Sequence, residues 1–261
     1  MRLFLGIVAI SLCFAGRLIA ADINSSIGAN AKWAEIEIKG EIVNSDVGTF
    51  AGIVQSLHPK FDIVTIRLDS PGGDLLAAMK IGDIIRTEWL WTDLSRDANA
   101  QCASACVFIL AAGAVRIATD HQVSIHRPHF DEHLFSGLGQ HDAKIKYDEL
   151  SRQVEAYLSQ MGMSGDLFAA MMKVPSNKIR KLTYHELVNY WLVGKDPGYE
   201  EWLRANNVSK YGKQKMLEYD AWLGRESAFV ANCIGASQSE DLWRTCVLRF
   251  SSRDPSPIVG E

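Results

Sequence analysis

Three short segments carry residue types that could together perform nucleophilic chemistry on an acyl group. The first is Ser70-Pro71-Gly72-Gly73-Asp74, where an apolar run ends and an amphipathic stretch begins. A strand that passes through glycines into a helix leaves several backbone N–H groups directed outward, with the helix dipole behind them. Such a turn can bind a phosphate or stabilise an oxyanion, although a plain turn with Asp74 as the helix N-cap explains the same residues.

The second segment is "QCASACVFILAAG", residues 101–113, and the third is "QVSIHRPHF", residues 122–130. Ser104 lies among small residues where an apolar helix begins, which suits a nucleophile on a sharp turn but equally suits a helix cap. His126 ends a short apolar strand, a good position from which to face a cleft, although a lone histidine is more often structural. In this order, the glycine turn, the serine and the histidine form a catalytic constellation that is more specific than any one part.

The elements that must position these residues follow from the hydrophobic periodicity. Alternation or short apolar runs predict strands, and 3.6-residue spacing predicts helices. The first predicted strand starts at Trp33, and further strands are predicted over 62–68, 90–94, 115–118 and 122–126. Helices are predicted over 46–57, 74–86 and 104–113. Strands that alternate with helices predict an α/β fold with parallel pairing and right-handed crossovers.

The rest of the chain is predicted to be mainly helical. A loop rich in His and Gly runs from Pro128 to about Gln140, and a long helix follows over 142–161. "GKDPGY" at 194–199 is typical of a domain boundary. We therefore expect an α/β domain over 30–196 and a helical extension over 197–261, whose Trp, Leu and Met residues at helical spacing predict packing positions.

Composition and the first residues narrow the function further. Of 261 residues, 48% are hydrophobic and 22% are charged, and the net charge of −4 argues against nucleic acid or an anionic membrane surface as the main partner. Residues 1–21 combine Arg2, an apolar run and the small pair Ala20-Ala21, which indicates a cleaved signal peptide. The apolar run is too short to span a membrane. We expect a periplasmic or secreted protein with no membrane span after cleavage.

Four cysteines remain once the signal peptide is removed: Cys102, Cys106, Cys233 and Cys246. An even number in an exported chain indicates disulfides. The candidate pairs are Cys233–Cys246 and the tighter Cys102–Cys106; residues four apart on a helix have Cα atoms about 6 Å apart, within the disulfide range. As zinc ligands the cysteines lack the usual pair of short spacings.

The three segments resemble those of the ClpP/crotonase superfamily, and most closely the ClpP-type serine peptidases. "RLDSPGGDLL", "CASACVFILAAG" and "VSIHRP" are similar to that family's glycine turn, serine elbow and histidine segment, and the resemblance runs from about Ile36 to Val193. It implies a spiral of β-β-α units, a peptide or protein substrate, a homo-oligomer and no cofactor. By position, it also implies that Ser104 is the nucleophile, His126 is the general base, and Gly73 and Ala105 supply the oxyanion-hole N–H groups.

One departure from the family bears on the mechanism. The family has a catalytic aspartate just before the segment that matches "LTYHEL", whereas this chain has Ile179 there. Asn177 is the nearest polar candidate; its amide oxygen could orient the histidine but could not supply charge. An uncharged partner stabilises an imidazolium less, so slow or atypical catalysis is expected.

Several alternatives stay open. The related signal-peptide peptidase A and NfeD-type enzymes use a Ser–Lys dyad, for which Lys144 or Lys146 is suitably placed. A catalytically inactive module that binds peptides or assembles a complex is a second alternative. An acyl-CoA enzyme of the crotonase type is a third, although export and the Ser–His pair count against it. The histidine-rich loop has no HExxH motif, and no metal site is predicted.

Overall fold

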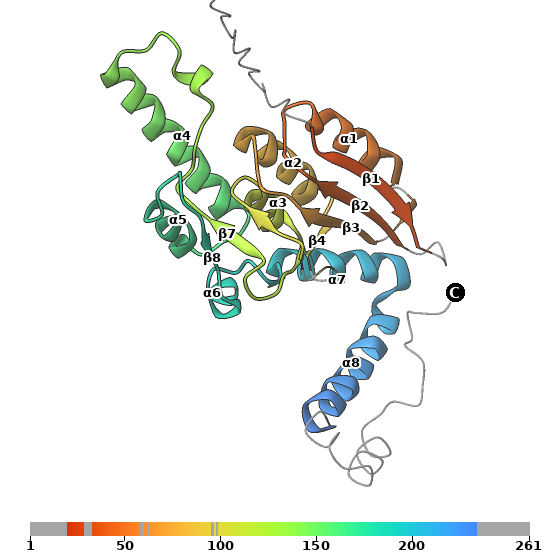
Figure 1. The fold of residues 1–261 in the computed structure, drawn as a ribbon. Helices are drawn as coiled ribbons and strands as arrows, with labels where there is room; N and C mark the ends of the chain where they lie inside the picture. The colour runs from red at the N-terminus through yellow and green to blue at the C-terminus, as the bar shows by residue number, and fades with distance from the viewer. Residues whose placement is uncertain are drawn as a thin grey trace, which may run out of the picture. The chain divides into compact units, whose positions relative to one another are not determined.

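The structure is a computed structural model that describes residues 20–233, apart from 29–32, 58–59, 62, 95–96 and 98. Figure 1 shows the path of the chain. In chain order the elements are β1 (Asp22–Ile27), β2 (Trp33–Lys39), α1 (Asp46–Leu57), β3 (Ile63–Asp69), α2 (Leu75–Thr87), β4 (Trp91–Asp93), β5 (Cys102–Ala103), α3 (Cys106–Ala112), β6 (Val115–Ile117), β7 (Val123–Ile125), the 3-10 helix η2 (Glu132–Phe135), α4 (Gln140–Gln160), α5 (Gly165–Met172), β8 (Arg180–Lys181), α6 (Tyr184–Asn189), β9 (Gly194–Lys195), α7 (Pro197–Tyr211) and α8 (Lys213–Cys233).

The larger sheet has the order β1-β2-β3-β4-β6-β9. Strands β2, β3, β4 and β6 pair in parallel, which confirms the predicted α/β class, and the edge strands β1 and β9 pair antiparallel. The segment of β1, "DINSSI", was not predicted as a strand because it lacks the apolar alternation of a buried strand. Its side chains are largely exposed at the edge of the sheet, where polar residues are tolerated.

A second sheet of three short strands, β5-β7-β8, lies beside the first. Strands β5 and β7 pair in parallel, and β8 pairs antiparallel with β7. Helix α3 follows β5 directly, and all seven of its residues are buried, so this helix has no face to solvent. Helix α2 packs against both α1 and α3. The serine-bearing turn therefore leads into the centre of the hydrophobic core.

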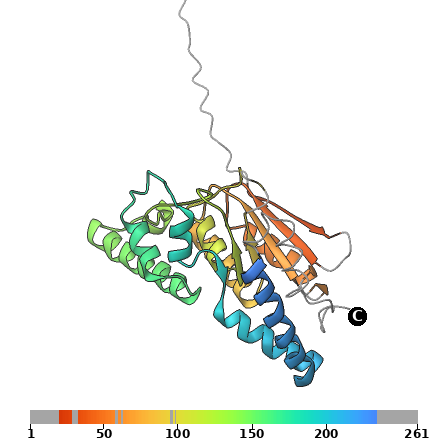
Figure 2. The same ribbon diagram turned by 90° about the horizontal axis from the view of Figure 1, so that it is seen from below.

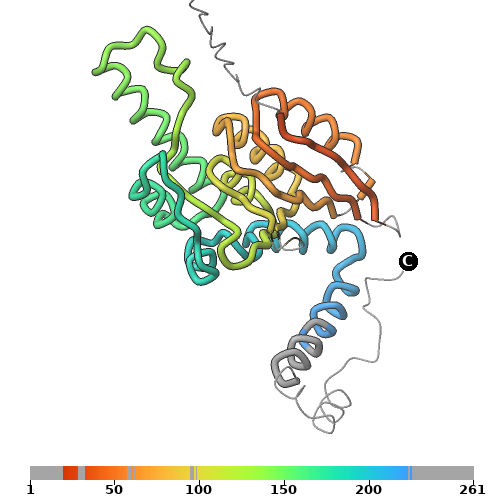
Figure 3. The backbone as a smooth tube through the Cα atoms, in the orientation of Figure 1, coloured from red at the N-terminus to blue at the C-terminus, as the bar shows by residue number. Residues whose placement is uncertain are grey.

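Helix α4 extends away from the strands at one side of this unit. Figure 3 shows that the chain after β7 runs out to the far end of α4 and then returns along the helix. Figure 2 again places α4 on the side away from β1 and β2. Near its C-terminal end, α4 is anchored by Tyr157, whose buried hydroxyl donates to Phe108 O over 2.9 Å and whose pKa is raised by burial.

A buried ion cluster joins α2 and β6 to Asp196, the last residue of the α/β unit. Arg86 Nη1 lies 2.8 Å from Asp196 Oδ2, and Arg116 Nη1 lies 3.8 Å from the same oxygen. The Arg116 guanidinium also donates to Gly113 O over 2.7 Å and to Trp191 O over 3.0 Å. Burial, with the neighbouring positive charge of Arg86, lowers the pKa of Arg116 to about 10. These carbonyl contacts compensate for part of the cost of burying the charge.

The chain divides into two compact units, residues 1–196 and 197–261. In the second unit α7 packs against α8. Tyr199 and Met216 are buried, but Trp202, Leu203 and Leu217, which were predicted to be packing positions, are exposed. Among the described helices, none combines the length and the apolar character that crossing a membrane requires. The predicted signal peptide lies almost wholly outside the described residues, and the predicted Cys233–Cys246 disulfide involves side chains that lie outside them.

Candidate active site

Ser104 occupies a sharp turn between β5 and α3. Its φ of +56° lies in the left-handed region, which is strained for a residue other than glycine. Helix α3 takes Ala105 as its N-cap, so the alternative interpretation of Ser104 as the capping residue is not supported. The side chain is half-buried, as a nucleophile at the edge of a core would be. This strand–turn–helix geometry is that of a nucleophile elbow.

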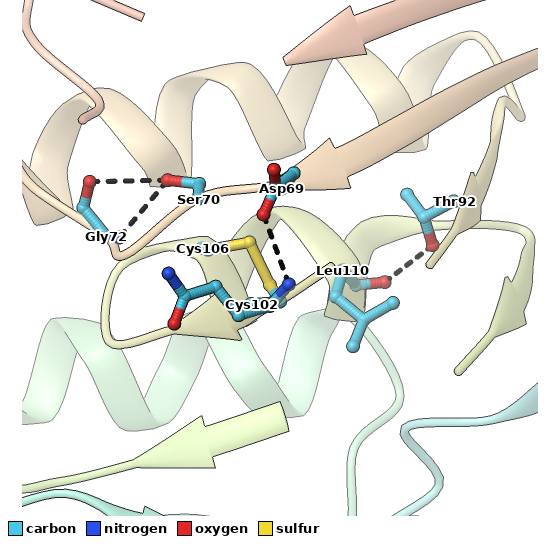
Figure 4. The surroundings of a disulfide bond; sticks show 8 residues. Asp69, Ser70, Gly72, Thr92, Cys102, Cys106 and Leu110 are labelled. Carbon is cyan, nitrogen blue, oxygen red and sulfur yellow. Dashed lines mark hydrogen bonds between the residues drawn. A yellow bond between two sulfur atoms is a disulfide. The ribbon is translucent and has the colours of Figure 1, made fainter. Parts of the chain in front are cut away.

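The elbow is held by backbone pairing on two sides and by one covalent bond. Ser70 accepts from Ala103 N over 3.0 Å and donates to Gln101 O over 2.7 Å, while Ser104 N donates to Ser124 O over 3.1 Å. A disulfide joins Cys102 to Cys106, whose Cα atoms are 5.2 Å apart. Figure 4 shows this bond between β5 and the start of α3, beside the turn at Ser70 and Gly72. The disulfide therefore spans the candidate nucleophile.

The glycine turn contacts the elbow directly. A Cβ on Gly72 would lie 2.7 Å from Ser104 Cβ, 2.8 Å from Ala103 O and 3.0 Å from Ala105 N. Such distances are too short for real side chains, so only glycine lets the two segments approach this closely. Gly72 and Gly73 also have φ values of +108° and +135°. Asp74 then caps α2, its Oδ1 accepting from Ala77 N over 3.0 Å.

The backbone N–H groups of Gly73 and Ala105 are the candidate oxyanion donors. Gly73 forms an isolated parallel bridge with Ile42, in which Ile42 N donates to Gly72 O and Asp74 N donates to Ile42 O. In this pattern the N–H of the middle residue points to the opposite side, away from Ile42. Within the described part of the chain, neither the Gly73 nor the Ala105 N–H donates a hydrogen bond to a protein acceptor. Both therefore remain available to a developing negative charge.

His126 follows β7 immediately, on the strand adjacent to the elbow. The register Cys102↔Val123 and Ala103↔Ser124 brings the carboxyl ends of β5 and β7 together, so Ser104 and His126 lie at the same edge of the small sheet. The imidazole Nδ1 lies 2.7 Å from Arg127 O. Because a carbonyl only accepts, Nδ1 carries the proton in this contact, and Nε2 of the neutral ring is left as the acceptor. Ser104 and His126 are not hydrogen-bonded to each other in the hydrogen-bond network of the described residues.

Arg127 fastens the histidine segment to the end of α5. Its backbone N donates to Val174 O over 2.8 Å, and its Nε and Nη2 donate to Met172 O over 3.1 and 2.8 Å. A guanidinium at the C-terminus of a helix also interacts favourably with the helix dipole. The carbonyl that accepts from His126 is thus held in place by the residue's own N–H and side chain. This role could not be predicted from the sequence, because a backbone carbonyl is common to every residue type.

The other candidate residues lie apart from this arrangement. Asn177 is exposed in the turn after α5 and, within the described residues, makes no hydrogen bond to His126. Lys144 Nζ pairs with Asp148 over 2.8 Å, and its side chain is 75% exposed. Lys146 pairs with Glu149 over 3.2 Å on the same helix. A lysine acts as a base at neutral pH when it is desolvated, and Lys144 is solvated.

A hollow of about 470 Å³ opens beside Gly73. It lies between the start of α2 and the loop that follows His126, and a second hollow of about 550 Å³ adjoins the outer side of this loop. His129, Asp131 and His133 border both hollows. Among the described residues, no group of three histidine, cysteine or acidic side chains is arranged to hold a metal ion. A hollow of this size next to Gly73 has room for part of a peptide chain.

The comparison with protein-family models agrees with this geometry, whereas the comparison with curated proteins adds nothing. A search of curated proteins finds no match. The family model described as Clp protease matches residues 25–184, a range that contains the glycine turn, the elbow and the histidine segment. That range covers more than half of the chain. The protein belongs to the Clp protease family.

Proposed function

We propose that the protein is an exported serine peptidase of the ClpP type, in which Ser104 attacks the scissile carbonyl and His126 is the general base. The observation that carries the proposal is the left-handed backbone conformation of Ser104. This residue lies against Gly72, where the Cβ of any other residue would clash with it. A structural serine has no need of a strained backbone, whereas a nucleophile needs a sharp turn beside free N–H groups. Membership in a peptidase family agrees with this assignment.

In the acylation step, His126 Nε2 accepts the proton of the Ser104 hydroxyl as its Oγ bonds to the substrate carbonyl carbon. The carbonyl oxygen becomes an oxyanion, which the N–H groups of Gly73 and Ala105 stabilise. When the tetrahedral intermediate collapses, the C–N bond breaks and His126 returns the proton to the leaving amine. A water molecule then attacks the acyl-enzyme by the same route and regenerates Ser104.

The carbonyl of Arg127 takes the orienting role that an aspartate has in a charged triad. It holds the Nδ1–H of His126 and so favours the tautomer in which Nε2 can accept a proton. A neutral carbonyl stabilises the imidazolium less than a carboxylate does. We therefore expect slower turnover than a charged triad would provide.

Export and assembly are part of the same proposal. The pattern of residues 1–21 supports a signal peptide, and a disulfide at the elbow suits an oxidising compartment. The Clp protease family also suggests a homo-oligomer that acts on peptides or proteins.

Labelling with a fluorophosphonate probe tests the nucleophile directly. We expect the wild-type protein to be labelled, Ser104→Ala to be unlabelled, and His126→Ala to be labelled at least about 100-fold more slowly, because general-base catalysis contributes at least this much. His141→Ala is the matched control, since His141 is exposed at the start of α4. Equal labelling of the wild type and Ser104→Ala would contradict the proposal.

A second candidate function is a peptide-binding module without catalysis. It is favoured by the missing Ser104–His126 hydrogen bond in the described structure and by the uncharged partner of His126. In that case no serine probe reacts, although peptides still bind near Gly73.

Lys144→Met and Lys146→Met variants test the remaining alternative, because loss of labelling in either would favour the Ser–Lys dyad over His126.

A further inference from the structure

The hollow beside Gly73 adjoins the proposed oxyanion hole, because Gly73 belongs to both. One side is formed by residues 41–44, which precede α1, and another by residues 73–76 at the start of α2. The loop of residues 129–134 supplies the third side. If the Gly73 N–H binds the oxyanion, the substrate side chain adjacent to the scissile carbonyl lies next to this hollow.

Much of the wall of the hollow is apolar. Ile42 and Phe130 are buried core residues that reach its surface, and Leu76 and Leu134 are half-buried. Phe130 is further held by an edge-on contact with Tyr147, with ring centroids 5.5 Å apart. An extended aliphatic chain would remove this apolar surface from water.

Acidic residues outnumber the other ionisable residues of the hollow, which are His129 and His133. Glu41, Asp74 and Asp131 contribute carboxylates, and its lining contains no Lys or Arg. Two of these carboxylates are fixed in place: Asp74 Oδ1 accepts from Ala77 N over 3.0 Å, and Asp131 Oδ1 accepts from His133 N over 2.8 Å. Positioned carboxylates around an apolar hollow attract a cation on a long aliphatic stem.

We propose that this hollow is a specificity pocket for a lysine or arginine side chain on the residue that donates the scissile carbonyl. The inference rests on the proposed function and adds its substrate class. The aliphatic stem packs on Ile42, Leu76 and Phe130, and the cationic end meets the carboxylates at the rim. A neutral apolar side chain would desolvate the same carboxylates without pairing them, which costs free energy.

The test uses peptides that differ only at this one position, with lysine, norleucine or glutamate. Norleucine keeps the aliphatic stem and lacks the charge. We expect kcat/KM to be about tenfold higher for lysine than for norleucine, and lowest for glutamate, because each partly desolvated charge pair changes binding by roughly three- to tenfold.

Variants of the rim assign the preference to this pocket. Glu41→Gln and Asp131→Asn each lower the lysine-to-norleucine ratio of kcat/KM by roughly three- to fivefold, because lysine loses a partner charge and norleucine no longer desolvates that carboxylate. Asparagine also retains the capping contact of Asp131. Glu132→Gln is the matched control, because Glu132 lies on the same loop but borders only the second hollow.

The binding of the same peptides to Ser104→Ala separates failure of this inference from failure of the proposed function. If no peptide is cleaved and no probe reacts, but Ser104→Ala still binds the lysine peptide more tightly than the norleucine peptide, the pocket assignment stands and the catalytic proposal fails. If the probe labels Ser104 but norleucine or glutamate is preferred in both cleavage and binding, the pocket assignment is overturned. The absence of any preference in binding would also overturn it.

Discussion

The serine elbow and the histidine segment lie on neighbouring parallel strands, yet they are held in place by different means. The elbow has strand pairing on two sides, a disulfide across it and the fully buried α3 behind it. The histidine segment depends on a three-residue strand, a two-residue neighbour and the contacts of the exposed Arg127. The nucleophile is therefore fixed by the core, whereas the base is fixed by hydrogen bonds that water can reach. We expect substitutions at the elbow to have larger effects than substitutions around the histidine.

The largest effect is expected where the elbow meets the glycine turn. In Gly72→Ala the new methyl group would clash with Ser104 Cβ and Ala103 O, so one segment must move. We expect probe labelling to fall by at least about 100-fold, since a displacement near 1 Å costs about that much, and stability to fall by about 2 kcal/mol or more.

Gly194→Ala is the matched control for this substitution. Gly194 has the same φ of +108° but no atom within 4 Å of the added Cβ. It should lose stability, by about 1–2 kcal/mol from backbone strain, without losing probe labelling. Equal losses of labelling in the two variants would show that the close approach of the glycine turn to Ser104 is not the reason why position 72 needs glycine.

The second effect concerns the disulfide across the elbow. Cys102→Ala combined with Cys106→Ala opens a five-residue loop, which by chain entropy should lower the free energy of unfolding by about 2 kcal/mol. We expect probe labelling to fall by about tenfold, because the backbone hydrogen bonds at Ser70 and Ser124 still hold the turn. Thermal unfolding and labelling rates measure the two effects. Unchanged labelling would show that strand pairing alone fixes Ser104.

The third effect is in the histidine segment. Arg127→Ala removes the two side-chain hydrogen bonds to Met172 O but leaves the carbonyl that accepts from His126. We expect labelling to slow by roughly three- to fivefold with little loss of stability, because exposed interactions contribute about 1 kcal/mol or less. Arg127→Lys should recover part of the rate, since it restores a donor. A loss as large as that of His126→Ala would contradict the division between a rigid elbow and an adjustable base.

The smallest effect concerns the strand that borders the histidine segment. Arg180 of β8 pairs with Glu186, whose pKa is lowered by the Arg180 hydrogen bond and by the backbone N–H of Thr183. A lowered carboxyl pKa contributes stability above the ordinary value of 4.5, and this contribution is lost as pH falls through the folded-state pKa. We expect Glu186→Gln to cost a few tenths of a kcal/mol at neutral pH, and the difference from wild type to vanish in acid.

Chemical denaturation at several pH values measures this difference. Glu149→Gln, which breaks the Lys146 pair on the exposed face of α4, is the control and should show a smaller dependence. A difference for Glu186→Gln that grows as the pH is lowered through the acid range would contradict the assigned sign.

The elbow could be predicted from the sequence more fully than the histidine segment. The spacing of the two glycines, and of the serine between two alanines before an apolar run, reflects the backbone geometry that these segments need. Residues 70–74 and 101–113 could therefore be predicted as turns that lead into helices. The Cys102–Cys106 disulfide was one of two candidate pairs, and its geometry was decided only by the turn between β5 and α3. The partner of His126 could not be predicted, because a main-chain carbonyl placed by α5 leaves no mark in composition.

The parts of the fold that were missed have a similar physical basis. Strand β1 is an exposed edge with polar side chains, and β8 and β9 have two residues each, so none shows a periodicity that could be recognised. The apolar residues of α7 and α8 were assigned to packing because helical spacing alone does not reveal whether another surface covers that face. Trp202, Leu203 and Leu217 remain exposed for this reason.

The complete burial of Cys102 and Cys106 has a practical consequence for purified material. Alkylating reagents react poorly with sulfur atoms that solvent does not reach, so a thiol titration of native protein would not detect these two cysteines whether the pair were joined or reduced. A preparation made in a reducing host could therefore pass as oxidised while carrying an unlinked turn around Ser104. Alkylation after denaturation, followed by mass spectrometry of the peptide that contains both cysteines, distinguishes the two populations and should accompany every measurement of its activity.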